Sequence, residues 1–173
     1  MERNSQNASS LTKRLTVDAM LTALALGVYF LEAWLPPMVP IPGVRLGLTN
    51  IVTLFALYRL GPRDGALVLL CRILLATFFG GQAVSLLFSL CGGLLAFLSM
   101  LLIKPLLGPK QIWVCSIIGA LAHNTGQLFA AWLILKQAAV FSYLPVLIIS
   151  AILTGLFTGI CAQELIHRLG KKS

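Results

Sequence analysis

Three groups of polar residues interrupt the long apolar stretches of this sequence, and their types could support ligand chemistry. The first is Arg72, which stands between the apolar residues 69–71 and 73–75. A charge in the middle of a lipid-embedded helix costs on the order of 3 kcal/mol, so it persists where it faces protein or a wet cavity. Arg72 is therefore a candidate ligand-binding residue. The alternative is a hydrogen bond to helix carbonyls or to a polar side chain.

The second group is His123, Asn124 and Gln127, which fall within one turn of an apolar segment. Gln127 lies three residues after Asn124 and four after His123, and both spacings place side chains on one helix face. Each of these groups needs hydrogen-bond partners that lipid does not supply. We expect them to line a cavity, and the alternative is interhelical hydrogen bonding.

The third group lies in residues 40–50, which are rich in proline and glycine and contain Arg45 and Asn50. Arg45 can either face the cavity or extend to the membrane surface. Glu32 can balance one of the two arginines. A pocket of this composition is electropositive and suits a small anionic or strongly hydrogen-bonding solute. The predicted substrate-binding residues are Arg45, Asn50, Arg72, His123, Asn124 and Gln127.

The elements that position these residues are helices. The chain is 58% hydrophobic and 10% charged, a balance that a soluble domain of 173 residues does not reach. Six apolar runs approach the roughly 20 residues that cross a bilayer. We predict an all-α membrane protein, a bundle of six transmembrane helices over residues 13–168, with a disordered polar tail at 1–12 and a basic tail at 169–173. The expected helices are about 16–35, 45–60, 66–79, 83–103, 113–135 and 145–167.

The distribution of lysine and arginine predicts the orientation. With the N-terminus in the cytoplasm, ten basic residues fall in cytoplasmic segments, and only Arg45 and Lys136 fall in outer loops. This asymmetry follows the positive-inside rule. It predicts a multi-pass protein of the bacterial cytoplasmic membrane with both termini in the cytoplasm and a pocket open to the exterior.

Several classes of function are excluded by motif. The sequence has no P-loop, no paired-aspartate magnesium motif, no HExxH and no GxSxG. We therefore expect no catalytic residues, no metal and no cofactor, and a protein that is not an enzyme. The basic residues form no stripe with interleaved aromatics, so we expect no nucleic-acid partner.

Small residues recur at four-residue spacing, which lets helices approach closely in lipid. Such pairs serve either internal packing or the docking of a partner. The pairs are Ala19 and Ala23, Ala122 and Gly126, and Gly155 and Gly159.

Residues 42–50 (PGVRLGLTN) and 119–127 (GALAHNTGQ) resemble the Gx transporter family, often labelled heptaprenyl diphosphate synthase component I. The resemblance covers residues 13–168. The family is similar in architecture to the S components of energy-coupling factor transporters. That analogy implies a subunit that captures a small solute, anionic or isoprenoid-like, in an outward-facing pocket. It also implies partners, a membrane coupling subunit and two ATPases, and a docking motif at Ala19 and Ala23.

The label implies a different alternative, a non-catalytic membrane component of a heptaprenyl or polyprenyl diphosphate synthase. Two arginines suit a diphosphate, and apolar walls suit a prenyl chain. A third alternative is a structural scaffold whose polar groups only bond one helix to another.

Overall fold

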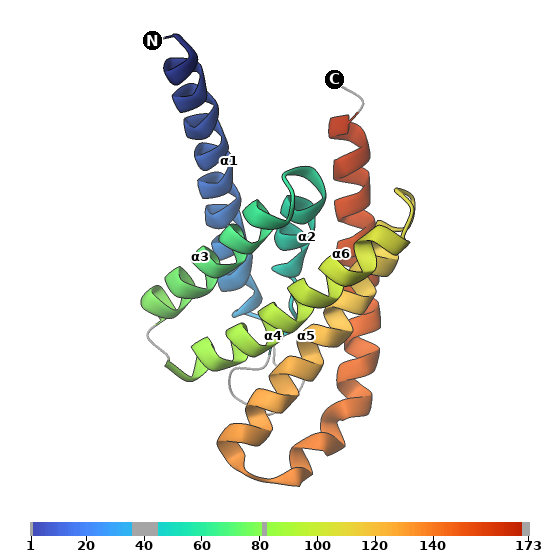
Figure 1. Cartoon of the computed structure of the whole chain (residues 1–173). Coiled ribbons are helices and arrows are strands. Elements are labelled where there is room, and N and C mark those ends of the chain that lie inside the picture. Colours follow the sequence, from blue (N-terminus) through green and yellow to red (C-terminus); the bar gives the residue numbers. More distant parts are fainter. Residues whose placement is uncertain (1, 36–44, 81–82, 171–173) are drawn as a thin grey trace.

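The computed structural model of this chain describes residues 2–35, 45–80 and 83–170. Within these ranges the fold is all-α and contains no strand, as the composition predicts (Figure 1). The helices are α1 (Glu2–Glu32), α2 (Asn50–Arg59), α3 (Pro62–Gly80), α4 (Ala83–Ile103), α5 (Ile112–Leu135) and α6 (Leu144–Gly170), with short 3-10 turns η1 (Lys104–Leu106) and η2 (Ala138–Tyr143).

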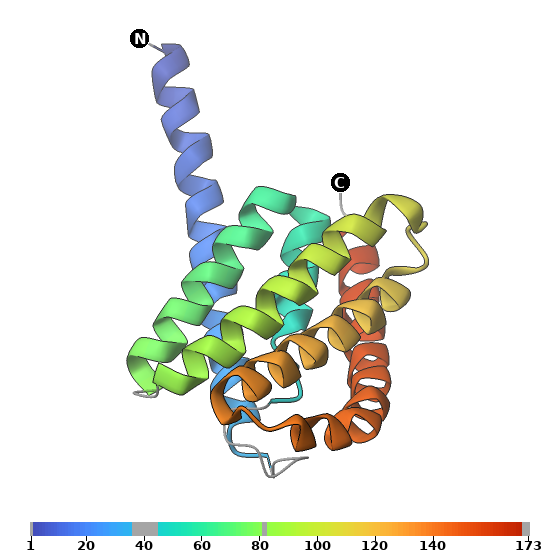
Figure 2. The same cartoon turned by 60° about the horizontal axis from the view of Figure 1, so that its bottom comes forward.

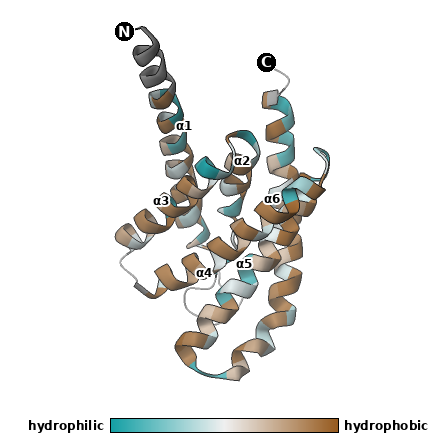
Figure 3. Ribbon diagram, viewed as in Figure 1, coloured by the Kyte–Doolittle hydropathy of each residue, from teal (hydrophilic) through white to brown (hydrophobic). Residues whose placement is uncertain are grey.

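Four segments are long and apolar enough to cross a membrane: Leu11–Glu32, Val84–Leu106, Ile112–Leu135 and Ala138–Leu169. Figure 3 shows the apolar colouring along most of α3 to α6. Large side chains such as Leu74, Phe78, Leu102 and Leu153 are exposed on the outside of the bundle. A surface of this kind is suited to lipid, so the chain is a membrane protein.

The short helix α2 lies at the centre of the bundle, where it contacts all five other α helices (Figures 1 and 2). Its ten residues extend only about 15 Å. Val52, Leu54, Ala56 and Leu57 are buried. Because α2 is enclosed by protein, it does not need the length or the uniform hydrophobicity of a lipid-facing span.

Helices α4, α5 and α6 pack side by side, and glycine permits their closest contacts (Figure 2). A Cβ added at Gly126 would lie 2.4 Å from the backbone oxygen of Cys91 on α4. One added at Gly159 would lie 2.6 Å from the Cα of Trp113 on α5. These two glycines therefore serve internal packing, whereas Ala19 and Ala23 are exposed on α1.

Three helix starts differ from the prediction by more than one residue. α1 begins at Glu2 rather than at 16, since adding residues to an existing helix avoids the cost of nucleation. α3 begins at Pro62 rather than at 66, because proline suits the first helical position and Asp64 favours the first turn. α2 begins at Asn50 rather than at 45. The expected loop at 36–43 and residues 171–173 of the basic tail lie outside the described residues.

An ion pair joins the N-terminal half of α1 to the start of α3. The Arg14 guanidinium donates from Nε to Asp64 Oδ1 at 3.0 Å and from Nη2 to Asp64 Oδ2 at 2.7 Å. The carboxylate is 9% exposed, while the arginine side chain is 53% exposed. This bidentate contact uses one edge of the planar guanidinium, and it gives a reference for Arg72, which is buried.

Candidate ligand-binding pocket

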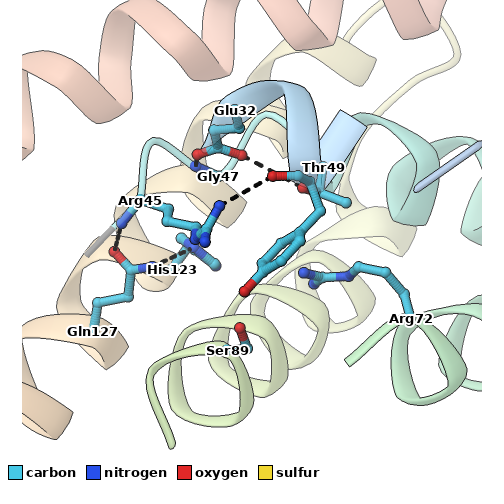
Figure 4. Close-up of a pocket in the computed structure, with 9 residues that line it drawn as sticks. Glu32, Arg45, Gly47, Thr49, Arg72, Ser89, His123 and Gln127 are labelled. Carbon is cyan, nitrogen blue, oxygen red and sulfur yellow. Dashed lines mark hydrogen bonds between the residues drawn. The ribbon is translucent and has the colours of Figure 1, made fainter. Parts of the chain in front are cut away.

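A polar pocket lies where the C-terminal end of α1, the segment 45–49 and the middle parts of α3, α4 and α5 meet (Figure 4). All of its lining residues are polar, charged or glycine. They are Tyr29, Glu32, Arg45, Gly47, Thr49, Arg72, Ser89, His123 and Gln127.

Residues 45–49 form a strap over this pocket instead of the first turn of α2. The Arg45 backbone N–H donates to Gln127 Oε1 at 3.1 Å, and the Gly47 N–H donates to Glu32 Oε1 at 2.7 Å. Gly47 has a φ of +78°, a left-handed conformation that favours glycine. These hydrogen bonds hold the strap in a conformation that a right-handed helix cannot include, because the φ of Gly47 is positive, so α2 begins only at Asn50.

The side chain of Arg45 also holds the strap to α1. Its Nη1 donates to the Tyr29 carbonyl at 3.0 Å, and its guanidinium carbon lies 3.9 Å from the centre of the Tyr29 ring. The Tyr29 hydroxyl in turn lies 2.7 Å from Ser85 Oγ on α4. Arg45 therefore has stacking and hydrogen-bond partners within the protein, rather than only extending to the membrane surface.

A hydrogen-bond chain determines the protonation of His123. Since Gln127 Oε1 accepts from the Arg45 N–H, its Nε2 must be the donor to His123 Nε2, 3.0 Å away. An imidazole nitrogen that accepts a hydrogen bond carries no proton, so His123 is neutral and protonated at Nδ1. It adds no charge to the pocket.

Arg72 lacks the partners that Arg14 has. It is 3% exposed, and neither Nε nor Nη2 has a hydrogen-bond partner within the described residues. Glu32 attracts Arg72 electrostatically, but the two side chains form no ion pair within the described residues. Its carboxylate accepts from Gly47 and, in a longer contact of 3.5 Å, from Thr49. The edge of Arg72 that is equivalent to the bonded edge of Arg14 is therefore open.

Two adjacent glycines on α4 allow this arrangement. A Cβ at Gly92 would lie 2.9 Å from the His123 ring, and a Cβ at Gly93 would lie 3.6 Å from Arg72 Nη2. The surface of α4 therefore recedes where the imidazole approaches it, whereas a Cβ at position 93 would make only an ordinary van der Waals contact with the guanidinium. A Gly-Gly pair inside an apolar helix is a sequence signal of close approach.

The free space at the centre of the pocket is about 10 Å³, enough for about one water molecule. Residues of the strap line this space together with Arg72 on α3 and Gln127 on α5 (Figure 4). A ligand larger than a water molecule therefore requires the strap or a neighbouring helix to move.

Residues 21–165 match the family described as heptaprenyl diphosphate synthase component I. The chain belongs to this family. The match covers most of the chain, including every described residue that lines the pocket. Comparison with curated proteins and comparison with solved structures each return no match.

Four of the six predicted site residues of this family member line the pocket: Arg45, Arg72, His123 and Gln127. Asn50 and Asn124 do not line it. Asn124 is turned toward α6, where its Nδ2 donates to the Leu147 carbonyl at 2.8 Å. Asn50 is buried behind Gly47.

The prediction omitted other residues that line the pocket. Tyr29 and Ser89 carry no strong sequence signal, because single hydroxyls are common in membrane helices. Gly47 and Thr49 fall within residues 42–50, the stretch that carries the family resemblance. Their position in this stretch is the sequence signal that could have identified them. Glu32 was expected only to balance an arginine, and it also holds the strap.

The described residues contain no group of three or more His, Cys, Asp or Glu that could hold a metal ion. The family description names a component of a synthase. The pocket presents hydrogen-bond donors and positive charge in the interior of the protein.

Proposed function

We propose that this chain is a membrane-embedded, non-catalytic subunit that captures a small anionic solute in the pocket beside Arg72. The observation that carries the proposal is the unpartnered Nε and Nη2 of a guanidinium that is 3% exposed. A buried charge without a partner is costly, and intramembrane charges are retained mainly where they have a function. Purely structural bonding leaves these donors unexplained.

Six crossings with both termini in the cytoplasm fit this role. The two termini lie at the same end of the bundle in Figure 1, which is the arrangement that an even number of crossings requires. The pocket contains Tyr29 and Glu32, at the opposite end of α1 from the N-terminus. With the orientation that the basic residues favour, the pocket then lies in the outer half of the membrane.

The transporter-subunit role requires a partner, since the sequence has no nucleotide-binding motif. α1 offers a surface for one. Ala19, Ala23 and Gly27 are exposed at four-residue spacing, and a Cβ at Gly27 would meet no atom within 4 Å. We propose that Ala19 and Ala23 dock a membrane coupling subunit, which works with two ATPases. Ala19→Leu with Ala23→Leu should then abolish co-purification of that subunit, while the exposed Met20→Leu should not.

The second candidate is the non-catalytic membrane component of a polyprenyl diphosphate synthase, which the family description favours. Its isoprenoid substrate would require apolar walls, and none of the residues lining the pocket is aliphatic. Co-purification separates the two candidates. A coupling protein and ATPases support the transporter subunit, and a soluble aspartate-rich synthase supports the second candidate.

Native mass spectrometry of mildly extracted protein tests the capture of a solute. We expect the wild-type spectrum to contain an adduct of constant mass that Arg72→Ala lacks. The matched control is Arg59→Ala, because Arg59 is an exposed arginine at the end of α2. Wild-type protein without an adduct, or an adduct that survives Arg72→Ala, counts against capture at this site.

A further inference from the structure

The pocket has a definite charge. Its ionised groups are the guanidinium groups of Arg45 and Arg72 and the carboxylate of Glu32, and the hydrogen bond from Gln127 keeps His123 neutral. One positive charge is therefore left without a counterpart among the lining residues. A buried site is most stable when its charges balance, so one negative charge completes it.

The open edge of Arg72 specifies how that charge is held. The N–H groups of Nε and Nη2 lie along the same edge of the planar guanidinium and match two oxygens of one group. The protein already contains this match, because Arg14 binds the two oxygens of Asp64 through the same pair of atoms. A carboxylate is the group of this shape that carries a single charge.

A diphosphate fits the same pocket less well. It carries more than one negative charge near neutral pH, so it would leave an excess negative charge beside Glu32. It is also bulky for a pocket with about 10 Å³ of free space. A carboxylate is planar and requires a smaller opening of the strap.

We infer that the solute bound beside Arg72 carries a single carboxylate, held side-on by Nε and Nη2 in the way that Asp64 is held by Arg14. This inference rests on the proposed capture of an anion, and it names the chemical class of the captured group. It also argues against a diphosphate headgroup at this site.

Thermal unfolding of the full chain in lipid nanodiscs tests the assignment with simple anions. The probes are acetate, inorganic phosphate and inorganic diphosphate, with chloride as the baseline at matched ionic strength. At about ten times its dissociation constant, acetate should raise the wild-type Tm by about 3 °C. Arg72→Met should lose this rise, and the control Arg59→Met should keep it. Phosphate and diphosphate should give smaller rises.

Ser89→Asp provides a second readout that needs no added anion. Ser89 lies on α4 and lines the same pocket as Arg72 (Figure 4), so aspartate there supplies an internal carboxylate. The variant should have a higher Tm than Ser89→Asn, and Arg72→Met should remove that gain. A stabilisation that depends on Arg72, from acetate or from Ser89→Asp, supports the inference.

The results that would overturn the carboxylate assignment differ from those that would overturn the proposed function. A larger, Arg72-dependent stabilisation by diphosphate than by acetate overturns the carboxylate assignment, while the capture of an anion stands. If neither acetate nor Ser89→Asp stabilises the protein, the assignment also fails. If neither an added anion nor Ser89→Asp has an effect that depends on Arg72, the proposed function fails together with it.

Discussion

Two arginines of this protein differ in whether the guanidinium edge formed by Nε and Nη2 has a hydrogen-bond partner. Arg14 is half-exposed and binds both oxygens of Asp64 through Nε and Nη2. Arg72 is buried, and the same two atoms have no partner in the described chain. A protein optimised only for stability would pair the buried arginine first, because its desolvation costs more. This difference is consistent with our proposal, in which Arg14 serves the fold and Arg72 binds a ligand.

Glu32→Gln should have the largest effect on this comparison. Glutamine keeps an oxygen that can accept from the Gly47 N–H but removes the one carboxylate of the pocket. Both arginines then lack an opposite charge, and we expect a loss of about 3 kcal/mol in the free energy of unfolding. Reversible unfolding in bicelles measures it. A loss below about 1 kcal/mol would contradict the charge balance described here.

Arg72→Met should change stability much less and in the opposite direction. Removal of an unpaired buried charge leaves stability unchanged or raises it by about 1 kcal/mol. Combined with Glu32→Gln, it should also restore part of the stability lost by that variant. If Arg72 were a structural residue of a scaffold, the same substitution would instead cost about 3–5 kcal/mol. The double-mutant cycle decides between these outcomes.

Asp64→Asn should produce a smaller effect than either change in the pocket. It breaks the bidentate pair with Arg14, but water can replace Asp64 as the partner of the half-exposed guanidinium. We expect the Tm to fall by about 1–2 °C, with no change in the response to acetate. A loss of the acetate response would show that the two arginines are coupled rather than separate.

Arg168→Gln should have the smallest effect. Arg168 and Glu164 form an exposed i,i+4 pair on α6, with a separation of 3.4 Å. Such pairs contribute about 0.3–0.5 kcal/mol. The variant therefore measures the baseline loss in the free energy of unfolding when an arginine is removed from the surface. A loss larger than about 0.5 kcal/mol would weaken the interpretation of the pocket variants.

Hydrophobicity made most of the fold predictable. The expected helix at residues 83–103 coincides with α4, and α5 starts one residue earlier than expected. These helices face lipid, so their composition alone marks them. The start of α2 was wrong by five residues, because the hydrogen bonds from Arg45 and Gly47 to Gln127 and Glu32 join segments far apart in the sequence. No local pattern contains that information.

The charged residues of the pocket could be predicted, because a charge at membrane depth is rare. Arg72 and Arg45 were identified because a charge in an apolar segment requires an explanation. Asn124 was misplaced because it directly follows His123, and consecutive residues of a helix point about 100° apart. If His123 faces the pocket, Asn124 must face a neighbour, and that neighbour is α6. The small volume of the pocket depends on side-chain packing, which the sequence pattern does not contain.

An experimental structure of the protein in lipid nanodiscs with acetate tests the central claim most directly. The account predicts density for a planar anion whose two oxygens lie about 2.7–2.9 Å from Arg72 Nε and Nη2, with the strap displaced to admit it. A structure in which these two nitrogens bond to protein carbonyls, or point toward acyl chains, would contradict it.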